Sequence, residues 1–152
     1  MRLIVPYSFI LLLLAVLVFS CRRDQVLTDP SAKLNFSMDT VLFDTVFTSI
    51  GSSTRQLKIY NNNNRNIIVS NIRLAGGTAS QYRFNVDGIP GPAVQDLEVL
   101  ANDSLFLFVE VTVDPLNVNS PLIIKDSILF ETNGNLQDVD LVAWGQNAHY
   151  IR

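Results

Sequence analysis

The chain has 152 residues, of which 11 are basic and 14 are acidic, and its formal net charge is −3. Its only adjacent basic residues are Arg22 and Arg23, so the sequence lacks the electrostatic footprint of a nucleic-acid-binding protein. Cys21 is the single cysteine, which excludes an intramolecular disulfide and leaves stability to an ordinary hydrophobic core.

The first 21 residues, MRLIVPYSFILLLLAVLVFSC, combine one positive charge, an apolar run over 3–19, and Ser20 directly before Cys21. This layout resembles a bacterial lipoprotein signal, whose last four positions are here filled by 18–21, Val-Phe-Ser-Cys. The resemblance implies cleavage before Cys21, a thioether-linked diacylglycerol on its sulfur, and a further acyl chain on the new amino group. Two or more acyl chains hold a protein stably on a membrane without spanning it.

Two other interpretations of the N-terminus fit less well. A transmembrane helix needs roughly 20 apolar residues, and this run is shorter and contains Pro6. A plain secretory signal does not require a cysteine at this position. We therefore expect a signal peptide over 1–20, and a lipidated Cys21 followed by a polar tether to residue 33.

The residues after Cys21 bear on the location. In some Gram-negative lineages an acidic run directly after the cysteine marks surface-exposed lipoproteins, whereas here Arg22 and Arg23 occupy those positions. We expect an outer-membrane lipoprotein of the cell envelope, on the periplasmic face rather than at the cell surface. Without residues 1–20, the chain keeps ten basic and fourteen acidic residues and a net charge of −4.

From Leu34 onward the chain is β-rich, with short runs of Val, Ile, Leu, Phe and Thr between segments rich in Asn, Gly, Asp, Ser and Pro. Residues 34–147 are enough for one domain, followed by a tail over 148–152. The expected strands are 34–43, 54–61, 66–75, 81–87, 94–100, 104–113, 123–132 and 136–145. Seven or eight short strands at this spacing, without helices, predict an all-β, immunoglobulin-like β-sandwich.

Alternation and turn chemistry support several of these strands. In 81–87, Tyr82, Phe84 and Val86 oppose polar neighbours, as in a half-buried strand. Asn133-Gly134 predicts a two-residue hairpin turn, because both residues tolerate positive φ. The run 104–113 is apolar on both faces at its start, which predicts a central strand. Its expected core face consists of Leu105, Leu107, Val109, Val111 and Val113.

The stretch over 49–77, SIGSSTRQLKIYNNNNRNIIVSNIRLAGG, has a glycine before a strand, a strand ending in Asn, a partner strand and a glycine pair. Residues 100–146 continue with a polar turn, a long strand ending near Pro115, and a hairpin whose first strand ends in Thr132-Asn133. This order resembles the ASH-type immunoglobulin-like domain, named from abnormal-spindle and hydin proteins, over about 49–147. The resemblance implies a seven-stranded sandwich that serves as a binding or spacer module.

Few residues suggest reaction chemistry. His149 is the only histidine and lies in the predicted tail, so it has no partner for a metal site or a serine nucleophile. Asp138 and Asp140 share one strand face, as in a glycosidase pair, but a solvated strand face is the favoured interpretation. We expect no catalytic residue, no metal, no cofactor and no enzyme activity.

Two kinds of surface site are candidates. Aromatic side chains that could stack on a sugar are Phe106, Phe108 and Trp144, with Tyr60 and Tyr150, against the alternative that they fill a core or an interface. Asp-Ser/Thr-aliphatic triplets predict O-glycosylation at Thr40, Thr45, Ser104 and Ser127, although the same pairs also form turns.

Together these observations predict a non-catalytic, lipid-anchored envelope protein whose sandwich binds another envelope protein or acts as a spacer. A glycan-binding surface lipoprotein is the alternative.

Overall fold

The computed structural model describes residues 26–47, 54–113 and 122–146. The predicted signal peptide, Cys21 and the tail with His149 and Tyr150 lie outside these ranges. Within them, the protein has no helix with the length and apolar character needed to cross a membrane.

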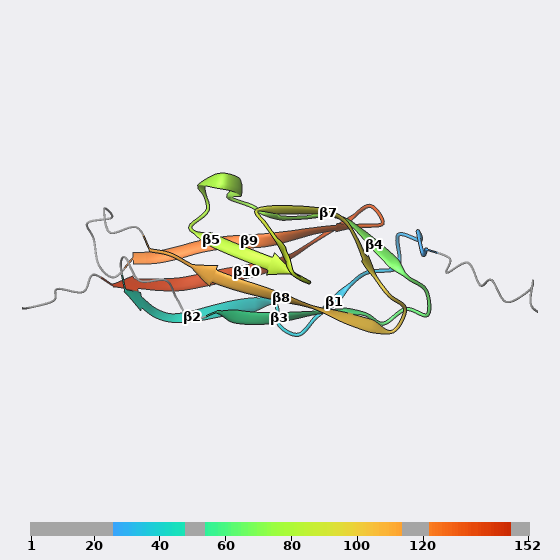
Figure 1. The fold of residues 1–152 in the computed structure, drawn as a ribbon, viewed down its shortest axis with the longest axis horizontal. Helices are drawn as coiled ribbons and strands as arrows, with labels where there is room; N and C mark the ends of the chain where they lie inside the picture. The colour runs from blue at the N-terminus through green and yellow to red at the C-terminus, as the bar shows by residue number, and fades with distance from the viewer. Residues whose placement is uncertain (1–25, 48–53, 114–121, 147–152) are drawn as a thin grey trace, which may run out of the picture.

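Two five-stranded sheets pack face to face into an elongated sandwich (Figure 1). The first sheet has the order β1-β3-β8-β5-β6, with β1 (Asn35–Phe36), β3 (Arg55–Asn61), β8 (Asp103–Val111), β5 (Tyr82–Val86) and β6 (Ile89–Pro90). The second has the order β2-β10-β9-β4-β7, with β2 (Thr40–Phe47), β10 (Asn135–Gln146), β9 (Leu122–Thr132), β4 (Ile67–Leu74) and β7 (Ala93–Val99). A 3-10 turn, η1 (Gly77–Ala79), follows β4. The predicted all-β, immunoglobulin-like sandwich is confirmed.

The core lies between the sheets and follows the period of two that the sequence predicts. In β8, Leu107, Val109 and Val111 are at most 1% exposed, while Phe106 and Phe108 point outward. β8 is the middle strand of its sheet, as predicted for 104–113. Leu105 packs against the core from a half-buried position, and Val113 is buried.

The expected strand 34–43 is in fact two strands in different sheets. β1 pairs antiparallel with β3, and after Ser37 the chain crosses to the second sheet, where β2 runs parallel to β10. Ser37 fixes the crossing, because its N–H donates to Lys58 O and its Oγ accepts from Lys58 N, both at 3.0 Å. The inward-facing positions change parity at this crossing, from Leu34 and Phe36 to Val41 and Phe43, so 34–43 is not one continuously alternating strand.

Two tight hairpins use residues with positive φ. Asn133 (φ 50°) and Gly134 (φ 77°) join β9 to β10, as predicted. Asp87 (φ 49°) and Gly88 (φ 84°) join β5 to β6, a hairpin that the expected strands omitted. Asp-Gly is itself a strong signal for this turn type, and it places Asp87 beside the middle of the first sheet.

The sandwich has two distinct ends (Figure 1). The described chain starts at Val26 at one end, here called the near end, which also carries the Asn133-Gly134 hairpin. β2, β8 and β10 finish at the opposite, far end, where Gln146 pairs with Phe47.

The later part of the predicted tether is docked on the near end. Leu27 N donates to Asn66 O at 2.7 Å, Ala32 is 6% exposed, and Asn133 Nδ2 donates to Ala32 O at 3.2 Å. Residues 26–33 therefore pack against the sandwich.

Candidate binding surfaces on the two outer faces

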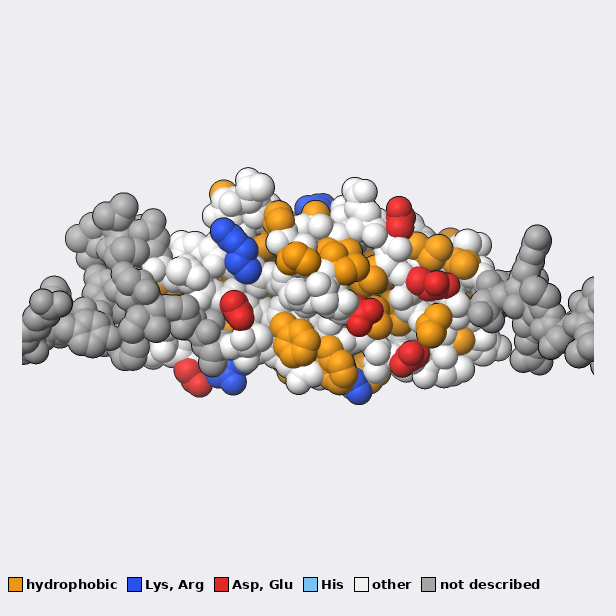
Figure 2. Space-filling view, in the orientation of Figure 1, with side chains coloured by type: hydrophobic (Ala, Val, Ile, Leu, Met, Phe, Trp, Pro, Cys, Tyr) orange, Lys and Arg blue, Asp and Glu red, His pale blue; other side chains and the backbone are white. Residues whose placement is uncertain are grey.

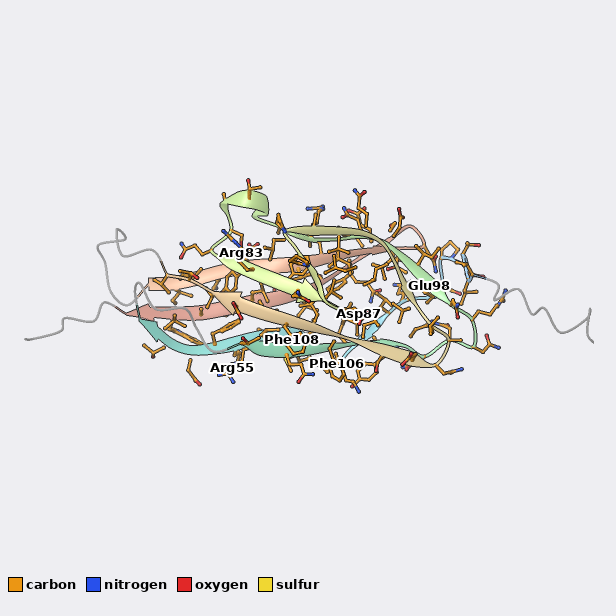
Figure 3. All side chains as sticks on the ribbon, viewed as in Figure 1. Arg55, Arg83, Asp87, Glu98, Phe106 and Phe108 are labelled. Carbon is orange, nitrogen blue, oxygen red and sulfur yellow. The ribbon has the colours of Figure 1, made fainter. Side chains whose placement is uncertain are left out.

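The first sheet presents an aromatic surface to solvent. Because the inner side chains of β8 fill the core, Phe106 and Phe108 project from the outer face, where they are 42% and 41% exposed. Their ring centroids are 6.4 Å apart and their planes differ by 28°, so the two rings are roughly parallel neighbours. With Lys58 and Tyr60 of β3, these rings define the aromatic face, which Figures 2 and 3 view from the front.

Polar groups of opposite charge flank the rings. On the β3 side, Lys58 is the register partner of Phe106, and its Nζ lies 4.9 Å from the Phe106 centroid and 5.4 Å from that of Tyr60. These distances allow cation–π attraction. On the β5 side, Asn85 pairs with Phe108, and Asp87 N donates to Phe106 O at 3.1 Å. The exposed Asp87 side chain lies beside Phe106 (Figure 3).

The outer face of the second sheet carries a separate apolar group, the tryptophan patch, made of Leu42, Ile123, Val142 and Trp144. Trp144 of β10 pairs with Ile123 of β9, and Val142 pairs with Leu42 of β2. Trp144 is 38% exposed, Ile123 53% and Leu42 55%. The three predicted stacking aromatics are thus divided, with the two phenylalanines on one face and Trp144 on the other.

The sheet edges are less open to a partner than the faces. β1 and β6, at the edges of the first sheet, have two residues each. In β7, Asp96 adopts φ 52°, which interrupts the extended backbone of that edge. At the β2 edge a bulge leaves Asp44 98% exposed in its side chain, and Arg55 Nη2 of the other sheet bonds it at 2.9 Å. Short, kinked and charged edges discourage strand addition.

A polar groove of about 300 Å³ lies beside the patch, between β9 and β10. Its acidic groups hold local structure: Asp126 accepts hydrogen bonds from Gly76 N and Ser80 Oγ, and Asp140 accepts one from Ser127 Oγ at 3.0 Å. Asp138 and Asp140 are both exposed on the outer face of β10, as the alternation predicts. In the described ranges, no three His, Cys, Asp or Glu residues are grouped to hold a metal ion.

The four hydroxyls predicted to be O-glycosylated differ in accessibility. Thr45 is exposed in β2, while Thr40, Ser104 and Ser127 are half-buried. The Ser127 hydroxyl is already bonded to Asp140. Modification at these residues stays a prediction, and Thr45 is the most accessible of the four.

Lys58 and Asp87 were not identified as site residues from the sequence. Their place beside the phenylalanines depends on strand register, which joins residues 48 and 19 positions apart in the chain. The Asp87-Gly88 turn signal could have located Asp87 at the end of a hairpin, but not next to Phe106.

No protein-family model and no curated protein matches the chain. Among solved structures, a family 123 glycoside hydrolase from Clostridium perfringens matches with a TM-score of 0.50 and 10% identity, over 72% of this chain and 23% of that one. The E. coli chaperone DraB matches with 0.48 and 11%, over 78% and 55%, and the periplasmic chaperone SfaE with 0.45 and 12%, over 78% and 61%. The chain spans less than two thirds of each, and at these identities the likeness is one of fold alone, an immunoglobulin-like β-sandwich.

Proposed function

We propose that this chain is a non-catalytic, lipid-anchored protein of the cell envelope whose sandwich binds another protein through an outer face. The observation that carries the proposal is the grouping of exposed large apolar side chains on both outer faces, at the aromatic face and the tryptophan patch. Grouped exposed apolar surface of this kind is typical of protein interfaces.

The anchor is proposed at Cys21, on the periplasmic face of the outer membrane, as the N-terminal pattern indicates. Val26, where the docked segment begins, is five positions after Cys21, and five residue steps span at most about 18 Å. A lipidated Cys21 would therefore hold the near end close to the bilayer. The outer faces would then extend away from the membrane. The ASH-type resemblance implies a binding or spacer module, which suits such a position.

The test is in-cell photocrosslinking of the full-length chain. A photoreactive phenylalanine analogue replaces Gln56 beside Phe108, Lys125 beside the tryptophan patch, or, as a control, exposed Thr78 of η1. Affinity purification and mass spectrometry then identify the adducts. We expect a specific protein adduct from one of the two surface positions and none from position 78. The absence of a specific protein adduct at both surfaces would refute the proposal.

Glycan binding is the second candidate, and it is favoured by one observation. The two exposed, roughly parallel rings of Phe106 and Phe108 have Lys58, Asn85 and Asp87 alongside. An exposed aromatic ring can stack on a sugar ring while neighbouring polar groups bind its hydroxyls. A carbohydrate adduct at position 56, without a protein adduct, would support this alternative.

A further inference from the structure

We propose that the aromatic face binds a second copy of this chain, in a pair related by a two-fold axis that runs along β8. This inference rests on the proposed function, in which an outer face binds protein, and it identifies that protein for this face.

The charge layout of the aromatic face is the first argument. Across the row of Phe106, Lys58 lies on one side of β8 and Asp87 on the other. Each belongs to a neighbouring segment that is hydrogen-bonded to β8, and neighbouring strands are about 4.8 Å apart. The face therefore has a positive and a negative flank at matched distances from its apolar centre.

This layout is self-complementary. Two sheets that meet face to face are exchanged by a two-fold axis lying in the plane between them, and such an axis along β8 reverses left and right. Lys58 of each copy then lies over Asp87 of the other, and Phe106 and Phe108 meet their counterparts at the centre. An isologous interface of this kind forms every contact twice.

The other rows of this face do not repeat the pattern. The row of Phe108, flanked by Gln56 and Asn85, carries no charge, and in the row after it Glu110 lies on β8 itself with Arg83 on the β5 flank. The rotation places the two Glu110 side chains near the axis and Arg83 of each copy diagonally beside Glu110 of the other. The charge match between the two copies therefore rests on the row of Phe106.

A neutral glycan gives no reason for opposite charges on the two flanks, and a strongly charged partner would match only one of them. A copy of the same surface matches both. Charge complementarity thus favours a second copy over the other occupants.

The test exchanges the charges. Full-length chains with two different C-terminal tags are co-expressed and extracted in detergent, and recovery of one tag through the other is measured. Lys58→Glu alone places two pairs of carboxylates opposite each other across the axis, and Asp87→Lys alone places two pairs of ammonium groups there. Juxtaposed like charges oppose association, so each variant co-expressed with itself should lose about tenfold or more of the wild-type recovery.

In the mixed pair, one chain carries Lys58→Glu and the other carries Asp87→Lys. One of its two contacts joins the introduced carboxylate to the introduced ammonium group, and the other joins the original Lys58 and Asp87, so recovery should return to near the wild-type level.

The matched control is Lys125→Glu, which reverses an exposed lysine on the outer face of the second sheet and should leave recovery unchanged. Because Asp87 has positive φ, Asp87→Asn serves as a second variant that keeps the turn and removes the charge. Thermal unfolding establishes that each variant is folded.

Absence of co-recovery for the wild-type pair, equal recovery for all pairs, or a mixed pair as weak as the single variants would each overturn the inference. A distinct protein crosslinked at position 56 together with any of these results would overturn only the self-association. A failure of protein crosslinking at both surfaces would overturn the proposed function as well.

Discussion

Tyr82 is the largest side chain that the core buries completely, and its hydroxyl donates to Ile124 O at 2.9 Å. Burial, together with the nearby Asp126 carboxylate, raises the pKa of Tyr82 above its ordinary value of 10.0. The folded chain therefore keeps the phenolic proton as the pH rises past 10, while the unfolded chain loses it. Stability supplied by this proton is complete below pH 10 and declines above it.

We predict that Tyr82→Phe reveals this linkage. At pH 7 the variant should lose about 1–3 kcal/mol, because Ile124 O is left without its donor. At pH 11 the wild type should have lost about 1.4 kcal/mol through Tyr82 alone, so the difference between the two chains should shrink by that amount. Urea unfolding of both chains in a Cys21→Ser background measures the difference. A difference that stays constant from pH 7 to pH 11 would contradict the assignment.

At the residue scale, the hydrogen-bond partners of Asn61 could not be predicted from the sequence. The sequence predicts it as the last residue of the strand 54–61, and in the structure it is the last residue of β3 and fully buried. Its Nδ2 donates to the carbonyls of Arg65, Val99 and Leu100. Two of these acceptors are 38 and 39 positions away, and no local sequence pattern predicts a partner at that distance.

At the scale of elements, most strands were predictable and their partners were not. The outward phenylalanines and inward aliphatic residues of β8 follow directly from alternation, and the Asn133-Gly134 hairpin follows from turn chemistry. The two-residue β6 is too short for a periodic signal. In 34–43 the inward positions change parity between Phe36 and Val41, but this change does not show which sheet each part joins. The candidate site depends on these less visible features, because β5, β6 and their turn place Asp87 beside Phe106.

Gly91, directly after β6, is predicted to be essential for that hairpin. Its N–H donates to Phe84 O at 2.8 Å, and a Cβ at this position would lie 2.4 Å from the Phe84 ring. Phe84 is 3% exposed and belongs to the packed core, so Gly91→Ala should cost about 1–3 kcal/mol. Gly77→Ala is the control, since a Cβ there meets nothing within 4 Å and only its φ of 57° opposes the change.

Urea unfolding of the two glycine variants measures both costs. The steric argument requires Gly91→Ala to be the more destabilising of the two. An equal or smaller loss at Gly91 would mean that Phe84 can shift without penalty.

At the scale of the whole molecule, the near end and the outer faces have different roles. The buried Asn66 joins several segments at the near end. Its side-chain amide donates to Glu98 Oε1 at 2.8 Å and accepts from Ala101 N at 3.0 Å, and its backbone carbonyl accepts from Leu27 N. The chain that leads to Cys21 is thereby fixed to the end of the sandwich, away from the aromatic face and the tryptophan patch. An anchor at Cys21 would leave both faces accessible.

This arrangement predicts that anchoring and folding are separable. Cys21→Ser removes the proposed lipid attachment but touches none of the core residues, which begin at Ala32. The variant should therefore move from the membrane fraction to the soluble fraction while keeping the wild-type far-UV circular dichroism and melting temperature. Arg22→Gln, which keeps the cysteine, should stay with the membrane. If Cys21→Ser also stays with the membrane, residues 1–20 are retained as an anchor. The near end would then be held by an uncleaved apolar segment instead of by acyl chains.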